Sequence, residues 1–201
     1  MSFALKIGRV YFSPVTVVTA LMIVYLSESA FALLIYAFAA IHELGHLICM
    51  KLCKIKTERV DIYPLSVAIT PVKTRFLTYR QQAIIAAGGP LTSLFAAVLF
   101  LAVGHFFHFT SLPICVFGNL WLFVINMLPI PLLDGGKIFE SFIMTRTDFI
   151  KGEQICKICA YTACAVSALA GCYIFYITKY NASLLITSIY MAISLYFSPR
   201  S

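Results

Sequence analysis

Two histidines and a glutamate in the pattern H-E-x-x-H are the residues of this chain best suited to do chemistry. His42 and His46 are four residues apart, so on a helix their imidazoles share one face and can bind one metal ion. Glu43 lies beside them as a candidate general base. A bound zinc ion lowers the pKa of a water molecule to about 7, which makes hydroxide available at neutral pH. The pattern therefore predicts metal-assisted hydrolysis, and it requires a third protein ligand.

Composition places this motif in a membrane protein. Hydrophobic residues make up 61% of the 201 residues, charged residues make up 11%, and the mean hydropathy is +0.93. An ordinary soluble domain is about 45–50% apolar and about 25% charged. The chain has too little polar surface to cover a water-soluble globule, which excludes a soluble enzyme and a disordered tail. His42 lies 12 residues after Ala30, or roughly 18 Å along a helix, so the motif is expected near the middle of the bilayer.

A carboxylate further along the chain is the best candidate for the third ligand. Asp134 follows Pro129 and Pro131 and precedes Gly135 and a second glycine. The prolines prevent a regular helix through this stretch, and the glycines let the backbone turn sharply. Irregular backbone at membrane depth is tolerated only where protein or water surrounds it, so we expect Asp134 to enter a wet cavity. Glu140 is the alternative ligand, and the residues alone leave this choice open.

Six apolar runs are candidate membrane spans of about 20 residues each. We expect them at 10–26, 30–53, 81–107, 113–128, 155–177 and 184–197. Six spans place both termini on the same face of the membrane. With the N-terminus in the cytoplasm, fourteen of the 15 Lys and Arg residues lie inside, and Lys179 alone lies outside. The positive-inside rule therefore predicts a multi-pass protein with cytoplasmic N- and C-termini.

The segment 56–76 differs from the apolar runs. It alternates β-prone residues and is punctuated by Pro64 and Pro71, which favours short strands or a hairpin at the cytoplasmic face. A plain connecting loop is the alternative. We therefore expect an all-α integral membrane protein with about six helices, one β-prone segment and a helix broken by proline at the active site. We expect a single polytopic domain over 1–201, with no PDZ domain and no CBS domain.

The distribution of charge and the cysteine content limit the classes of binding partner that we expect. The net charge is +7, but the basic residues gather between apolar runs, as they do in cytoplasmic loops. We therefore expect contact with the lipid bilayer and no nucleic-acid partner. The seven cysteines are odd in number and lie mostly in apolar runs, which favours packing over a disulfide framework and over a metal or redox role.

The pairing of H-E-L-G-H in a span with the later N-x-x-P-x-P-x-x-D-G-G resembles the site-2 protease family (M50) of intramembrane zinc metalloproteases. The short length and the N-terminal position of the first motif resemble one branch of it, that of the stage IV sporulation protein FB, which cleaves a membrane-tethered pro-sigma factor. The resemblance implies one zinc ion bound by His42, His46 and Asp134. It further implies that Glu43 is the catalytic base and that Asn126 positions the substrate or the oxyanion.

Three residues of the third apolar run match another element of that family. Gly88, Gly89 and Pro90 imply a close helix approach or a helix break beside the site, and simple helix packing is the alternative. Many members of the family carry an asparagine three residues after the proline, where this chain has Ser93. The remaining residues given a substrate-contacting or structural role are Pro129, Pro131 and Gly135.

The resemblance implies an endopeptidase that hydrolyses a peptide bond of a membrane-associated protein within a bacterial membrane, either the cell membrane or that of a forespore. The resemblance implies a pro-sigma factor of sporulation as substrate and an inhibitory membrane protein as a second partner. A general site-2 protease acting on another tethered regulator or on remnant signal peptides is the main alternative. A zinc transporter or sensor is a further alternative. A catalytically silent adaptor is the last one, and the intact Glu43 argues against it.

Overall fold

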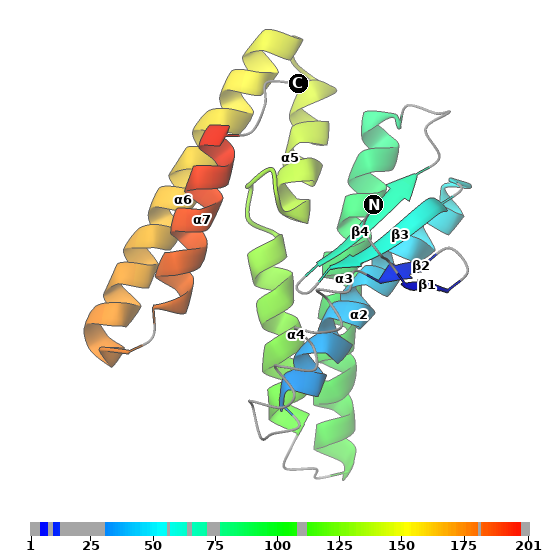
Figure 1. Ribbon diagram of the computed structural model, residues 1–201, viewed down its shortest axis with the longest axis vertical. Coiled ribbons are helices and arrows are strands. Elements are labelled where there is room, and N and C mark those ends of the chain that lie inside the picture. The colour runs from blue at the N-terminus through cyan, green and yellow to red at the C-terminus, as the bar shows by residue number, and fades with distance from the viewer. Residues whose placement is uncertain are drawn as a thin grey trace.

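The structure is a computed structural model that describes residues 5–7, 10–12, 31–55, 57–63, 66–71, 77–107, 112–180 and 182–197. Its elements are β1 (Leu5–Ile7), β2 (Val10–Phe12), α2 (Phe31–Leu52), β3 (Thr57–Tyr63), β4 (Ser66–Pro71), α3 (Tyr79–Phe107), α4 (Leu112–Asn126), α5 (Asp134–Met144), α6 (Phe149–Thr178) and α7 (Ser183–Phe197) (Figure 1). Among the described helices, α2, α3 and α6 are long and apolar enough to cross a membrane, and α4 and α7 are shorter apolar helices. The predicted runs from 30–53 onward each fall on one of these five helices.

Helices α2 and α3 touch through backbone at two glycines. A Cβ atom placed on Gly45 would come closer than 3.0 Å to the carbonyl of Gly88, and one placed on Gly88 would likewise come closer than 3.0 Å to the carbonyl of Gly45. Lipid tails are as apolar as leucine, so helices in a bilayer associate through close packing of small residues rather than through hydrophobic burial. The crossing therefore fixes α3 against the turn of α2 that carries the H-E-x-x-H motif.

The proline-containing stretch separates two helices. α4 ends at Asn126 and α5 begins at Asp134. Pro129 and Pro131 lie between them, where a continuing helix would lack two backbone donors and would clash with the proline rings. The break predicted from the sequence is therefore placed between α4 and α5, and it sets Asp134 in the first turn of a new helix.

The turn between α4 and α5 is compact. The Leu133 amide donates to the carbonyl of Ile130 at 2.8 Å, and Ile130 itself is fully buried. A Cβ atom on Gly135 or Gly136 would come closer than 3.0 Å to the backbone of this turn. The two glycines thus let the start of α5 pack directly against the chain that precedes it, while α5 also packs against α3.

Helices α6 and α7 form an antiparallel pair that follows α5 and lies to one side of α2 and α3 in Figure 1. α6 ends where Lys179 adopts a left-handed φ of 64°, and Gly171 lets the two helices approach closely. α6 begins at Phe149, six residues before the predicted Ile155. Its polar first turns are stabilised by an ion pair between Glu153 and Lys157, which hydropathy alone does not register.

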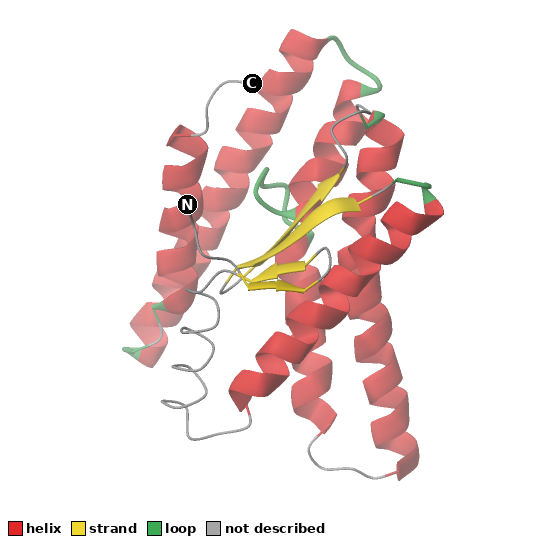
Figure 2. Cartoon of the chain, turned by 45° about the vertical axis from the view of Figure 1, so that its right-hand side comes forward, coloured by secondary structure: helices red, strands yellow, loops and turns green. Residues whose placement is uncertain are grey.

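A four-stranded sheet accompanies the helices, with strand order β1-β2-β3-β4 (Figure 2). β1 and β2 are antiparallel, β2 and β3 are parallel, and β3 and β4 are antiparallel, with Asp61 opposite Ala68. β3 and β4 occupy the segment for which strands or a loop were expected. The fold is therefore predominantly helical, as expected, and carries a small sheet in which the β-prone segment takes part.

The predicted first span needs correction at its start. It was expected from Val10, but Val10–Phe12 form β2 and pair with residues 60–62 of β3. β-branched and aromatic residues favour a strand where a neighbouring strand offers its edge, and an apolar run does not distinguish this from the start of a helix. The rest of that predicted span, 13–26, lies outside the described residues.

Candidate metal centre

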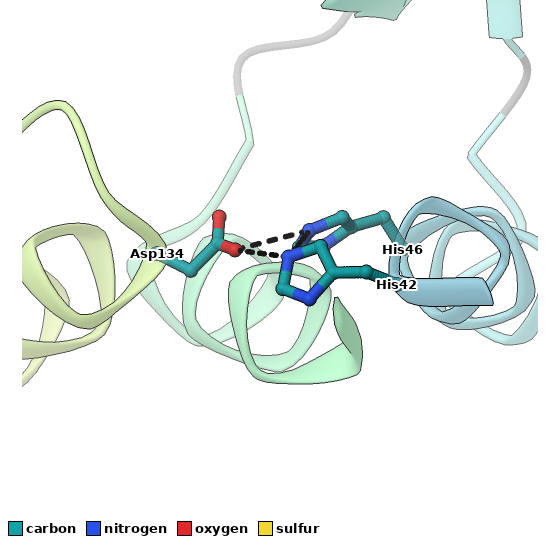
Figure 3. A group of neighbouring side chains, drawn as sticks. All are labelled: His42, His46 and Asp134. Carbon is teal, nitrogen blue, oxygen red and sulfur yellow. Dashed lines mark hydrogen bonds and ion pairs between the residues drawn. The ribbon is translucent and has the colours of Figure 1, made fainter. Parts of the chain in front are cut away.

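Three buried side chains from two helices converge on one point. His42 Nε2 lies 3.0 Å and His46 Nε2 lies 3.1 Å from the same Asp134 oxygen, Oδ2, and the two nitrogens are 3.3 Å apart. In Figure 3 the imidazoles extend from α2, and the carboxylate meets both of them from the opposite side. In the part of the chain that the structure describes, these three form the group of His, Cys, Asp and Glu side chains that could hold a metal ion.

The spacing and orientation of these atoms fit a metal ion. Two ligands bound tetrahedrally to zinc at about 2.0–2.1 Å lie about 3.3 Å from each other, close to the three distances observed. The Nδ1 of His46 lies 2.8 Å from the carbonyl oxygen of Ile85. A carbonyl only accepts, so this nitrogen carries the proton, and the Nε2 of a neutral His46 turns its lone pair toward the centre. With the nitrogen in this state, a cation bound between it and the carboxylate oxygen would stabilise their close approach, so the three residues could hold a metal ion.

Gly89 makes room for both imidazoles. A Cβ atom at this position would come closer than 3.0 Å to the Nε2 of His42 and to the Nε2 of His46. Gly88, one residue earlier, lies at the crossing with α2. Pro90 is buried inside α3, and the helix runs through it without a break. The structure thus has a close helix approach and an unbroken helix at this element, and a role of these residues beyond helix packing stays a prediction.

Residues outside the group contact each of its members. The Nδ1 of His42 lies 2.9 Å from the hydroxyl oxygen of Ser93, which is fully buried on α3. The ammonium group of Lys137, one turn after Asp134 on α5, lies 3.4 Å from its second oxygen, Oδ1. The sequence marks Ser93 only as a departure from a family pattern, and it predicts no role for Lys137. The i, i+3 spacing from Asp134 was the available signal for the lysine.

The remaining predicted site residues lie at different distances from the group. Glu43 is half-buried beside His42, and its carboxylate interacts electrostatically with both imidazoles and with Asp134. The side-chain amide of Asn126 donates instead to the carbonyl of Leu122 in its own helix, at 3.0 Å. Glu140, the alternative ligand, does not belong to the group within the described residues.

The prolines, Gly135 and the cysteines complete the predicted set. Pro129 and Pro131 lie in the turn before α5, and Gly135 packs against that turn, so all three shape the backbone that carries Asp134. All seven cysteines are free, and none of them belongs to the metal-ligand group. The packing role expected for the cysteines stays a prediction.

Comparison with known proteins adds a family and a fold. The sequence model of Peptidase family M50 matches residues 30–112 and 105–170. Stage IV sporulation protein FB of Bacillus subtilis (strain 168) is 24% identical over 158 residues, which are 78% of this chain and 54% of that protein. A zinc metalloprotease of Methanocaldococcus jannaschii is 25% identical over 128 residues, which are 61% of this chain and 37% of that protein. The chain therefore spans about half the length of the first relative and less of the second.

A solved structure resembles the whole chain. The site-2 protease from Methanocaldococcus jannaschii matches with a TM-score of 0.64 and 21% sequence identity, over 100% of this chain and 96% of that one. At 21% sequence identity, this match supports the fold alone. The family match covers the segments that carry His42, His46 and Asp134.

We expect Gly89→Ala to abolish metal binding, because the added methyl group would occupy the space of both Nε2 atoms. The measurement is the metal content of the purified protein. Gly104→Ala is the matched control on the same helix, since its Cβ atom would make an ordinary contact of 3.5 Å with Leu112. The control should keep its full complement of metal. Wild-type metal content in Gly89→Ala would contradict the placement of the site.

Proposed function

Because the chain belongs to Peptidase family M50, we propose that it is a zinc metalloendopeptidase that cleaves a membrane-associated protein within the bilayer. The observation that carries the proposal is the convergence of His42, His46 and Asp134 beside the carboxylate of Glu43. A catalytic zinc site typically has three protein ligands, drawn from histidine nitrogens and carboxylate oxygens, and keeps its fourth position open for water or substrate. A relative described as a zinc metalloprotease supports the choice of metal.

The division of roles follows from the chemistry of each group. His42, His46 and Asp134 would hold one zinc ion. When bound, zinc supplies a water molecule acidified to a pKa of about 7 and polarises the scissile carbonyl. Glu43 would accept a proton as the water oxygen bonds to the carbonyl carbon. It would then deliver that proton to the amide nitrogen as the C–N bond breaks.

Asn126 would act on the substrate rather than on the metal. It is the last residue of α4, directly before the turn that leads to Asp134. Its amide would exchange the bond to Leu122 for one to the substrate backbone or to the developing oxyanion, where a side-chain donor stabilises negative charge.

A membrane-tethered transcription regulator is the substrate class we propose, with a pro-sigma factor of bacterial sporulation as its specific member. The resemblance of the two motifs to the sporulation branch supports this choice. The similarity to the stage IV sporulation protein FB over 78% of this chain supports it further. Cleavage near the cytoplasmic face would release such a regulator into the compartment where it acts.

We expect Glu43→Gln to lose cleavage and to keep its zinc. An amide cannot accept the proton, and general acid–base catalysis is typically worth about 10²- to 10⁴-fold, so cleavage should slow at least about 100-fold. The chain is co-expressed with a membrane-tethered pro-sigma factor, cleavage is followed by gel mobility, and zinc is assayed in the purified proteins. Glu140→Gln is the control, since this carboxylate lies outside the metal-ligand group, and it should retain both cleavage and zinc.

Two results would count against this mechanism. Unchanged cleavage in Glu43→Gln would remove Glu43 as the base. A wild-type protein that binds zinc and leaves the tethered substrate intact would contradict the substrate class and favour a zinc transporter or sensor.

The edge of the sheet is the place where we propose that the substrate pairs. A helical substrate hides its carbonyls in hydrogen bonds, so the segment to be cut must be extended. β4 (Ser66–Pro71) is an edge strand in the described sheet, and it precedes α3, the helix that carries Gly89. An extended segment can add to such an edge through main-chain hydrogen bonds.

Proline substitutions along β4, at Val67, Ala68, Ile69 and Thr70 in turn, should therefore alternate in effect. Where the N–H group points away from β3, proline removes a donor to the substrate, so cleavage should fall while the folded protein accumulates normally. At the intervening positions proline removes a donor to β3 and should lower accumulation itself. Expression level and cleavage of the tethered substrate are measured together, and equal effects at all four positions would refute pairing at this edge.

We also propose a bacterial membrane location for a multi-pass domain with both termini in the cytoplasm. The distribution of Lys and Arg between the apolar runs supports this orientation. A fluorescent protein fused after Ser201 should then fluoresce, and alkaline phosphatase inserted after Lys179 should be active in the periplasm. The opposite pair of results would reverse the topology.

A further inference from the structure

A buried serine on α3 contacts one of the two histidines from behind. Ser93 is fully buried, and its hydroxyl oxygen lies 2.9 Å from the Nδ1 of His42, the ring nitrogen that faces away from Asp134. The opposite nitrogen of the same ring, Nε2, points into the metal-ligand group. The hydroxyl is therefore placed to act on the imidazole without contacting a metal or a substrate.

The contact belongs to a regular pattern on α3. Ile85, Gly89 and Ser93 follow each other at intervals of four residues, so they share one face of the helix. The carbonyl of Ile85 contacts the Nδ1 of His46, and Gly89 leaves space for the two Nε2 atoms. One face of α3 thus provides a hydrogen-bond partner for the Nδ1 of each imidazole. Between these two partners, Gly89 leaves the space that the two Nε2 atoms occupy.

The group that hydrogen-bonds to Nδ1 decides which nitrogen of the imidazole ring carries the proton. A neutral imidazole has one N–H group, and a metal binds the nitrogen that lacks it. In His46 the proton is on Nδ1, because the carbonyl of Ile85 beside this nitrogen can only accept a hydrogen bond. For His42 to bind metal through Nε2, its Nδ1 must donate, and the oxygen of Ser93 is the acceptor within reach.

We propose that Ser93 is a positioning residue that holds the His42 ring in the orientation and tautomer that bind the metal. The inference rests on the proposed metal centre and deepens it. Metal-ligating histidines commonly donate their second ring nitrogen to such a partner, and removal of the partner typically weakens metal binding by about 10- to 100-fold.

Two other serines, one half-buried and one buried, show how a merely structural hydroxyl behaves. Ser167 donates to the carbonyl of Ala163 at 2.7 Å, and Ser188 donates to the carbonyl of Leu184 at 2.6 Å. Each of these bonds stays within one helix and joins residues four positions apart. The contact of Ser93 instead joins α3 to a histidine on α2, 51 residues away in sequence.

The test compares Ser93→Ala with Ser188→Ala in the full chain. Ser188 is as buried as Ser93 but bonds only to its own helix, so it is the matched control. Zinc affinity is measured in detergent by competition with a chelator, and the thermal unfolding midpoint is measured without zinc. We expect Ser93→Ala to bind zinc about 10- to 100-fold more weakly. The control should match the wild type in zinc affinity, and the two metal-free variants should have similar midpoints.

The outcomes separate this inference from the proposal beneath it. A wild-type protein that binds no zinc would overturn the proposed function and this inference with it. Zinc binding by the wild type with equal affinity in Ser93→Ala would overturn the positioning role alone. Equal weakening in both variants would do the same, since it would reveal a general cost of losing a buried hydroxyl.

Discussion

The backbone contact between Gly45 on α2 and Gly88 on α3 is the constraint on which the site depends. Neither position has room for a side chain, and close packing of small residues is what holds helices together in lipid. Since Gly89 follows directly, the same crossing presses the backbone of α3 against both imidazoles. The spacing of the histidines comes from α2 alone, but their orientation requires the neighbouring helix at this distance and in this register.

The third ligand, Asp134, is positioned by the proline-containing turn between α4 and α5. Pro129 and Pro131 end the run of α4, and the buried Ile130 anchors the turn that follows. α5 then starts at Asp134 and packs against α3. A straight continuation of α4 would carry this carboxylate away from the histidines, so the irregular turn positions it. α3 is the common support, because it contacts α2 at the glycines and also packs against α5.

Local patterns predicted the parts of this arrangement that are themselves local. His42, Glu43 and His46 are neighbours on one helix, and Asp134 is marked by the prolines and glycines around it. The helices α2 to α4, α6 and α7 follow from apolar runs. β2 was assigned to a span, because Val10–Phe12 are as apolar as the residues of a helix and their pairing partner lies some 50 positions away. The separate roles of Gly88 and Gly89, and the contact from Ser93 to His42, depend on the rotation of one helix against another, which no single-chain pattern encodes.

Because the ligands are divided between α2 and α5, a bound ion would connect two helices that are far apart in the sequence. His42 and Asp134 are 92 residues apart, and an ion bound by both would cross-link that length of chain. The free energy of binding would then add to the stability of the folded protein by mass action. α5 leads directly into the α6–α7 pair, so a strain on that pair would reach a metal ligand within one short helix. Occupancy of the centre and the placement of α6 and α7 would be thermodynamically linked, each resisting a change in the other.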